Sequence, residues 1–198
     1  IQQLRVAGET SAAAVWLLDP RSEQSNVGLI GNQAARNEQP LLSELYYLDR
    51  ALDPFAKSTT GTLADLLEQN ISVLFVTTPL PADAASLKKL QNWIEAGGVL
   101  VRFAGSVNTN TKKPDPFTPV GLREGDRNLG GALSWTKPQA LAAFAAGSPF
   151  AGLPVPSDLR VNRQLLADPS PDLSGHTWAN LTDGTPLVTA KAIGRGHT

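Results

Sequence analysis

Five polar residues stand where apolar, strand-like runs of the sequence end, namely Asp19, Thr77, Thr78, Arg102 and Ser106. Open α/β sheets bind ligands at the carboxyl ends of their strands, so side chains at these positions can meet at one site. Carboxylate, hydroxyl and guanidinium groups bind polar or charged ligands through hydrogen bonds. These five are therefore the candidate ligand-binding residues, and no residue is predicted to be catalytic.

Ser106 is the candidate that most resembles a nucleophile following a strand. A nucleophile elbow needs the turn Gly-x-Ser-x-Gly, whereas the chain reads AGSVN around Ser106 and has glycine at neither required position. Ordinary turn chemistry is the favoured interpretation. The alternative is a hydrolase that uses Ser106 or a carboxylate at the strand ends. Such an enzyme needs a base near its nucleophile, and His176 is the only histidine away from the end of the sequence.

Arg102 interrupts the apolar run of a strand that we expect near the centre of a sheet. The favoured interpretation is that its stem lies along the sheet while its guanidinium pairs with a carboxylate such as Asp19. The alternative is an anion-binding guanidinium at the end of the sheet.

The sequence predicts no metal site and no cofactor. His176 and His197 have no closely spaced His, Asp or Glu partner, and the chain contains no cysteine. Its glycines match neither Gly-x-Gly-x-x-Gly nor the phosphate loop of nucleotide-binding proteins. Trp135 and Trp178 are interpreted as core or rim residues rather than as a stacking platform.

The stretch 81–105 must position these residues, because it joins an amphipathic helix to a buried strand. Leu87, Leu90 and Ile94 recur at helical spacing over 82–96, and polar residues occupy the other side. Gly97 follows the last periodic residue, where a left-handed conformation ends a helix without a Cβ penalty. The apolar run 99–103 follows directly and predicts a strand covered on both faces.

The remaining elements are predicted from periodicity and from turn residues. The runs 13–18, 71–77 and 99–103 are expected to be parallel strands of one sheet, and 27–30 is a short extended element or part of a loop. Helices are expected over 40–52, 62–69 and 138–146, and 55–58 is a possible edge strand. Alternation over 159–165 predicts a strand, and Asp183-Gly184 predicts a hairpin between 177–181 and 187–193.

This order of elements predicts an α/β fold with an open, mostly parallel sheet and an antiparallel β addition at the C-terminal end. We interpret 1–198 as a single α/β domain cut from a larger membrane protein. Its parts are a parallel core over 1–105, a long loop and helix over 106–157, and antiparallel strands over 158–198.

Composition narrows the possible functions. A net charge of −1 argues against nucleic acid and anionic membrane surfaces as partners. No apolar run reaches the ~18–20 residues of a membrane span. The absence of cysteine suits an oxidising compartment and excludes disulfides and cysteine nucleophiles.

Several blocks resemble one protein family: LLSELYYLDRALDPF, LADLLEQNISVLFV, LQNWIEAGGVLVRFAG, LGGALSW, SPFAGLP and WANLTDGTPLVTAKAIGRGHT. They resemble the class I glutamine amidotransferase-like middle domain of bacterial inner-membrane proteins. Those proteins also have an aerotolerance-type N-terminal double membrane segment and a C-terminal domain of unknown function 4159. The resemblance implies a flavodoxin-like α/β fold. Active amidotransferases need a cysteine and a downstream His-x-Glu, and this chain has neither.

The resemblance also carries expectations about location and role. It implies an inner-membrane-anchored protein with this part on the periplasmic side, and membrane contact only through segments outside this chain. The expected partners are other domains of the same protein or of a membrane complex. The favoured function is a catalytically inactive module that binds a partner or a ligand, with the hydrolase as the alternative.

Overall fold

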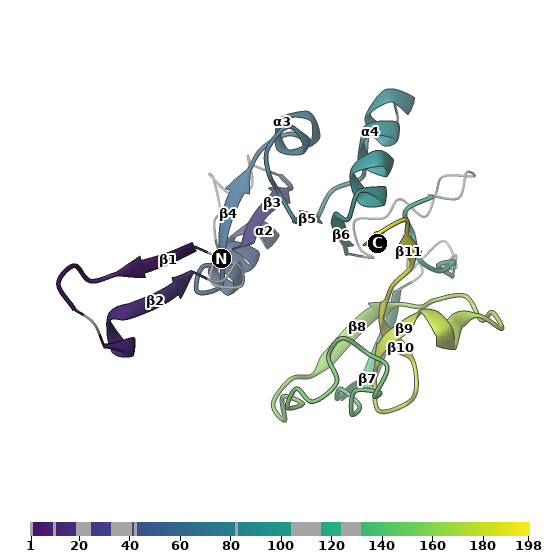
Figure 1. Cartoon of the computed structure of the whole chain (residues 1–198). Helices are drawn as coiled ribbons and strands as arrows, with labels where there is room; N and C mark the ends of the chain where they lie inside the picture. Colours follow the sequence, from purple (N-terminus) through teal and green to yellow (C-terminus); the bar gives the residue numbers. More distant parts are fainter. Residues whose placement is uncertain are drawn as a thin grey trace.

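The computed structural model of the chain describes residues 2–9, 11–18, 25–32, 41, 43–81, 83–103, 116–123 and 132–198 (Figure 1). Within these residues the largest sheet has six strands in the order β11-β12-β6-β5-β3-β4. Their bounds are β3 (Ser25–Ile30), β4 (Ala56–Thr60), β5 (Val73–Val76), β6 (Val99–Arg102), β11 (Ala192–Ile193) and β12 (Gly196–His197). All neighbouring pairs are parallel except β11 with β12.

Taken in chain order, the five parallel strands have the arrangement 2-1-3-4-5, which is that of the flavodoxin-like fold. The expected open, mostly parallel α/β sheet with a C-terminal antiparallel addition is confirmed. The possible edge strand at 55–58 is also confirmed, because β4 forms one edge of this sheet.

Among the described residues, three helices cover the sheet: α2 (Glu44–Leu52), α3 (Leu63–Leu67) and α4 (Ala84–Glu95). On one face, α3 and α4 pack on β5 and β6 through a cluster of buried side chains that includes Leu66, Leu74, Leu90, Ile94 and Leu100. On the other face, α2 packs through Leu45 on Val27 and Leu29 of β3. Side chains alternate along β5, so Leu74 and Val76 face α4 whereas Val73 and Phe75 face α2.

Helix α4 lies within the predicted range 82–96, and it ends before Gly97 as the sequence predicts. The Asp83 carboxylate accepts a hydrogen bond of 2.7 Å from the amide of Ser86 and so caps the first turn. At the other end Gly97 has a φ of +120°, a conformation that residues with a Cβ rarely adopt. Leu90 and Ile94 are fully buried, which confirms the predicted inner face.

The Asp83 cap predicts a pH dependence of stability. The hydrogen bonds from Ser86 lower the pKa of the Asp83 carboxyl in the folded protein. A lowered folded-state pKa means that this contribution is present above the unfolded value of about 4 and is lost as the pH falls through the folded value.

Asp83→Asn keeps an acceptor oxygen without a titrating carboxyl. We therefore expect the stability advantage of wild type over Asp83→Asn to shrink when the pH is lowered from neutral to about 2.5. Urea denaturation of both proteins at the two pH values measures this. An advantage that stays constant would contradict the role assigned to the Asp83 charge.

The prediction that 13–18 is a parallel strand of the main sheet is wrong. Residues Ala12–Ala14 form a 3-10 turn, and β2 (Val15–Leu18) pairs antiparallel with β1 (Gln2–Arg5) in a separate two-stranded sheet. The first strand of the main sheet is instead β3, which contains the element expected at 27–30. In β3 the position of Gly28 lies under Leu66 and Leu74, so the missing side chain leaves room for the helical layer.

The helix predicted over 138–146 is also wrong, and with it the helix assigned to the 106–157 part. Strand β7 (Ala132–Gln139) pairs antiparallel with β8 (Val161–Leu165), and its register shifts between Ser134 and Gln139. Beyond it, Leu141 forms a bridge with Leu181, so non-local pairing overrides the helical preference of the alanines. The rest of the loop expected from 106 lies partly outside the described residues.

The predicted hairpin around Asp183-Gly184 is confirmed. Strands β9 (Thr177–Asn180) and β10 (Pro186–Thr189) pair antiparallel across it, and the strand predicted at 159–165 is β8. In Figure 1 these strands lie on the β6 side of the main sheet, away from β1 and β2. No helix among the described residues is both long and apolar enough to cross a bilayer.

Candidate functional site

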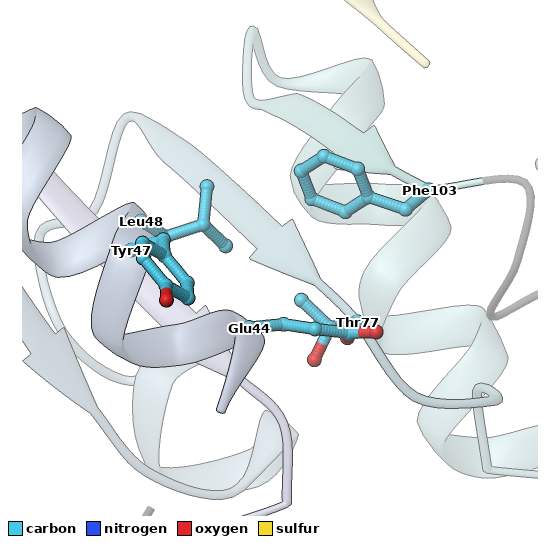
Figure 2. Close-up of a pocket in the computed structure, with 5 residues that line it drawn as sticks. All are labelled: Glu44, Tyr47, Leu48, Thr77 and Phe103. Atoms are coloured by element: carbon cyan, nitrogen blue, oxygen red, sulfur yellow. The ribbon is translucent and has the colours of Figure 1, made fainter. Parts of the chain in front are cut away.

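A cavity of about 400 Å³ opens between helix α2 and the ends of strands β5 and β6. Its lining residues are Glu44, Tyr47, Leu48, Thr77 and Phe103 (Figure 2). Three of them come from α2, whereas Thr77 follows β5 and Phe103 follows β6. The cavity therefore lies at the carboxyl ends of parallel strands.

The strand order makes this edge a natural place for a ligand. From β3 the chain passes through α2 to β4 on one side, and later returns to β5 on the other side of β3. The connections thus diverge between β3 and β5, which is the topological switch point of a doubly wound sheet. Ligands of open α/β proteins bind in the crevice outside the strand ends at this point.

Thr77 is the most buried residue of the cavity, with 8% of its surface exposed. Its amide donates a hydrogen bond of 2.9 Å to the carbonyl oxygen of Ile30 at the end of β3. Its hydroxyl also points to that carbonyl oxygen, at 3.4 Å. These bonds fix Thr77 across the switch point and leave the lone pairs of its hydroxyl oxygen for another donor.

The polar wall on α2 consists of Glu44 and Tyr47. Glu44 is the acidic residue of the first helical turn, where the helix dipole stabilises a negative charge. The Tyr47 hydroxyl donates a hydrogen bond of 2.9 Å to the carbonyl oxygen of Leu41. The Tyr47 ring also packs edge-on against Tyr46, with ring centroids 5.5 Å apart. Two independent contacts therefore hold the Tyr47 side chain in place.

Leu48 and Phe103 supply the apolar walls. Leu48 packs at the edge of the cluster formed by α2 with β3 and β4. Phe103 is 41% exposed, a high fraction for a phenylalanine next to a buried strand. Figure 2 shows Phe103 and Leu48 on opposite sides of the cavity, and Glu44 extending toward Thr77. The cavity is thus mainly apolar, with a few polar atoms from α2 and from the end of β5.

The structure places the five predicted ligand-binding residues differently with respect to the cavity. Thr77 lines the cavity, whereas the half-buried Thr78 follows it and does not. Arg102 pairs in register with Val76 and shares a strand face with the buried Leu100, which packs against α4. Asp19 and Ser106 lie outside the described residues, so the pairing of Asp19 with Arg102 and the roles of both residues stay predictions.

The two histidines have structural contacts in the C-terminal strands. The Nδ1 atom of the half-buried His176 lies 2.9 Å from the carbonyl oxygen of Ala190, which links the start of β9 to the end of β10. The His197 ring lies 5.6 Å from the Trp178 ring, which also contacts Phe150. Trp178 is half-buried, as predicted. Within the described ranges, no three His, Asp or Glu side chains cluster closely enough to hold a metal ion.

Sequence reasoning missed Glu44, Tyr47, Leu48 and Phe103. The three α2 residues were overlooked because β3 was not assigned as the strand before α2, and the switch point depends on that assignment. Phe103 follows Arg102 directly, so the rule that found Thr77 applies to it too. The signal that could have identified Phe103 is its place as a large aromatic residue at the end of a predicted strand, whereas its exposure is a structural finding.

No protein-family model matches the chain, and no curated protein matches it. Similar solved structures are β-galactosidases. The enzyme from Rahnella sp. R3 has a TM-score of 0.54 at 15% identity over 88% of this chain and 28% of that one. The enzyme from Bacillus circulans sp. alkalophilus has a TM-score of 0.48 at 13% identity, over 87% and 27%. Gan42B, a GH42 β-galactosidase, has a TM-score of 0.47 at 12% identity, over 89% and 27%.

The likeness to the Rahnella enzyme shows the fold. The chain spans 28% of the length of that β-galactosidase, so the similarity concerns one part of a longer protein. The open, mostly parallel α/β architecture with its flavodoxin-like strand order is thus supported both by the strand order and by a solved structure.

Proposed function

We propose that this chain is a catalytically silent binding module, which holds a small ligand at the carboxyl edge of its sheet within a larger, membrane-anchored bacterial protein. The observation that carries the proposal is the cavity at the switch point between β3 and β5. Its volume of about 400 Å³ lies within the range of small-molecule sites. Its mainly apolar lining with a few fixed polar groups is also typical of such sites.

The contacts inside the cavity favour binding over the hydrolase alternative. Nucleophilic catalysis by a hydroxyl needs a neighbouring base that can take its proton. The Thr77 hydroxyl instead points to the carbonyl oxygen of Ile30, which cannot accept a proton at neutral pH. His176 is engaged with Ala190 beside the β9–β10 hairpin. A hydrolase that uses Ser106 or a carboxylate at the strand ends remains the alternative proposal, and Ser106 lies outside the described residues.

The setting of the module is part of the same proposal. The resemblance of the sequence blocks to amidotransferase-like middle domains supports attachment to an inner-membrane protein. A position on the periplasmic side is supported by the same resemblance and is consistent with the absence of cysteine. Partners would then be other domains of that protein or of its membrane complex.

Screening a small-molecule library by NMR tests the binding function. We expect ligands to shift the amide signals of Thr77, Glu44 and Phe103 in the isotope-labelled chain. Phe103→Ala should weaken this binding, because it removes one wall of the cavity. Phe55→Ala is the matched control, since Phe55 is 77% exposed and does not line the cavity. A library that leaves the signals of the lining residues unchanged would refute the proposal.

A further inference from the structure

Three polar side chains that line the switch-point cavity, those of Glu44, Tyr47 and Thr77, share one property, which is that each is left with a hydrogen-bond acceptor. The Tyr47 hydroxyl gives its proton to Leu41, at 2.9 Å. The Thr77 hydroxyl directs its proton to Ile30, at 3.4 Å. An ionised glutamate side chain such as that of Glu44 has no proton to donate. A ligand that satisfies these three groups must therefore supply the donors itself.

The charge of the site agrees with this pattern. None of the five lining side chains is basic, and Glu44 is the only one that carries a full charge at neutral pH. The positive end of the α2 dipole is already matched by the Glu44 carboxylate in the first turn. An anionic ligand would meet Glu44 without a compensating cation among these five described lining residues. A cationic donor would instead gain charge-assisted hydrogen bonds.

The two aromatic rings point to the same ligand class. Tyr47 and Phe103 line opposite parts of the cavity, and the face of an aromatic ring attracts a cation within about 6 Å of its centre. Helix α2 already contains one such pair, because the Arg50 guanidinium carbon lies 5.9 Å from the centre of the Tyr46 ring. Leu48 and the Phe103 ring also offer apolar contact for the body of a ligand.

From these observations we infer that the cavity binds a small organic cation, a protonated amine with an apolar body. The ammonium group donates to Glu44 and Thr77, and the apolar body packs between Leu48 and Phe103. This inference rests on the proposed binding function and names its ligand class. The volume of about 400 Å³ suits a molecule of drug-like size or smaller.

Three probes with the same phenyl ring and different head groups test the inference: phenethylammonium, 3-phenylpropan-1-ol and 3-phenylpropionate. Each is titrated into the isotope-labelled chain at neutral pH while the signals of the cavity residues are followed. We expect phenethylammonium to bind at least about tenfold more tightly than the alcohol, and the carboxylate to bind most weakly. Equal binding of the three would overturn the inference while leaving a working ligand site. Absence of binding by all three would overturn it as well.

Variants of the protein separate the effect of the Glu44 charge on ligand binding from the effect of the cavity shape. Glu44→Gln keeps the size of the side chain and should weaken phenethylammonium binding about tenfold, with little effect on the alcohol. Glu68→Gln is the matched control, because Glu68 is an exposed glutamate at the end of α3 outside the cavity. Unchanged amine binding in Glu44→Gln would contradict the assigned role of the carboxylate.

A fourth probe distinguishes a free amine from a lysine of a protein partner. Nα-acetyl-lysine methylamide has the same ammonium group on a side chain flanked by peptide bonds. We expect it to bind more weakly than phenethylammonium, since it has no ring to pack against Phe103. Tighter binding of the lysine derivative would assign the cavity to a protein partner and overturn the small-molecule inference.

Discussion

Gly196→Val is expected to detach the C-terminal hairpin, formed by β11 and β12, from the sheet and to lower the free energy of unfolding by about 3 kcal/mol. Gly196 is buried in β12, beside the end of helix α4 and the start of β6. A Cβ at this position would collide with the carbonyl oxygens of Gly98 and Ile94. These are backbone atoms, so they cannot move aside by a change of rotamer, which places the cost at the upper end for overpacking.

The contacts that surround Gly196 explain why its position matters. The amide of Arg195 donates a hydrogen bond of 3.1 Å to the carbonyl oxygen of Glu95, and its guanidinium donates one of 2.8 Å to Ala96. Glu95 is the last residue of α4 and Ala96 is its C-cap, where carbonyl groups have no partner within the helix. The amide of His197 donates to Gly98 at 3.2 Å. The β11–β12 hairpin therefore has two roles: it caps the end of α4, and it extends the sheet beside β6.

Chemical denaturation measures the loss, and hydrogen exchange of the His197 amide shows whether β12 has left the sheet. Gly147→Val is the matched control, because no atom lies within 4 Å of a Cβ at Gly147 and its φ is not positive. If Gly196→Val fails to fold, the smaller Gly196→Ala is expected to show the same increase in exchange. Stability within about 0.5 kcal/mol of wild type, with the amide still protected, would disprove this packing.

Much of the central fold could be predicted because the signals are local. The amphipathic pattern of α4 and the Gly97 that ends the helix are neighbours in the sequence, and both appear in the structure. The same holds for the Thr62 cap of α3, whose hydroxyl oxygen accepts from the amide of Asp65. The hairpin at Asp183-Gly184 depends on two turn residues alone.

The errors arose where partners distant in sequence decide the structure. The alanine-rich run before Val15 reads as a buried strand, but a run of alanines offers little apolar surface to bury. Gly28 weakens the strand signal of β3, although its missing side chain lets Leu66 and Leu74 pack closely. Residues 140–142 form backbone hydrogen bonds with the segment around Leu181 instead of a helix. No local sequence pattern indicates this pairing.

The candidate site was predictable only in part for the same reason. Thr77 follows the most strand-like segment of the sequence, so the rule of strand ends identifies it. Glu44 and Tyr47 lie on a helix, and their relevance depends on α2 following the strand next to β5. That neighbour relation is a property of the sheet order, which periodicity alone does not contain.

Leu90→Ala is expected to lower the free energy of unfolding by about 2–5 kcal/mol. Leu90 has no exposed surface and lies in the cluster that joins α3 and α4 to β5 and β6. Truncation removes the transfer free energy of the side chain and leaves a cavity that its neighbours fill only partly. The neighbours Leu74 and Leu100 sit on hydrogen-bonded strands, so the layer has little freedom to collapse onto the smaller residue.

Urea denaturation of wild type and Leu90→Ala measures this loss, and the slope of the transition should stay the same because the native surface does not change. Leu153→Ala is the matched control, since Leu153 is 58% exposed and the same truncation there leaves no internal cavity. We expect that control to stay within about 0.5 kcal/mol of wild type. Equal small effects in the two variants would mean that α4 does not pack on the sheet through Leu90. The packing that holds β5 and β6 in place, and so positions Thr77 and Phe103, would then have to come from other residues.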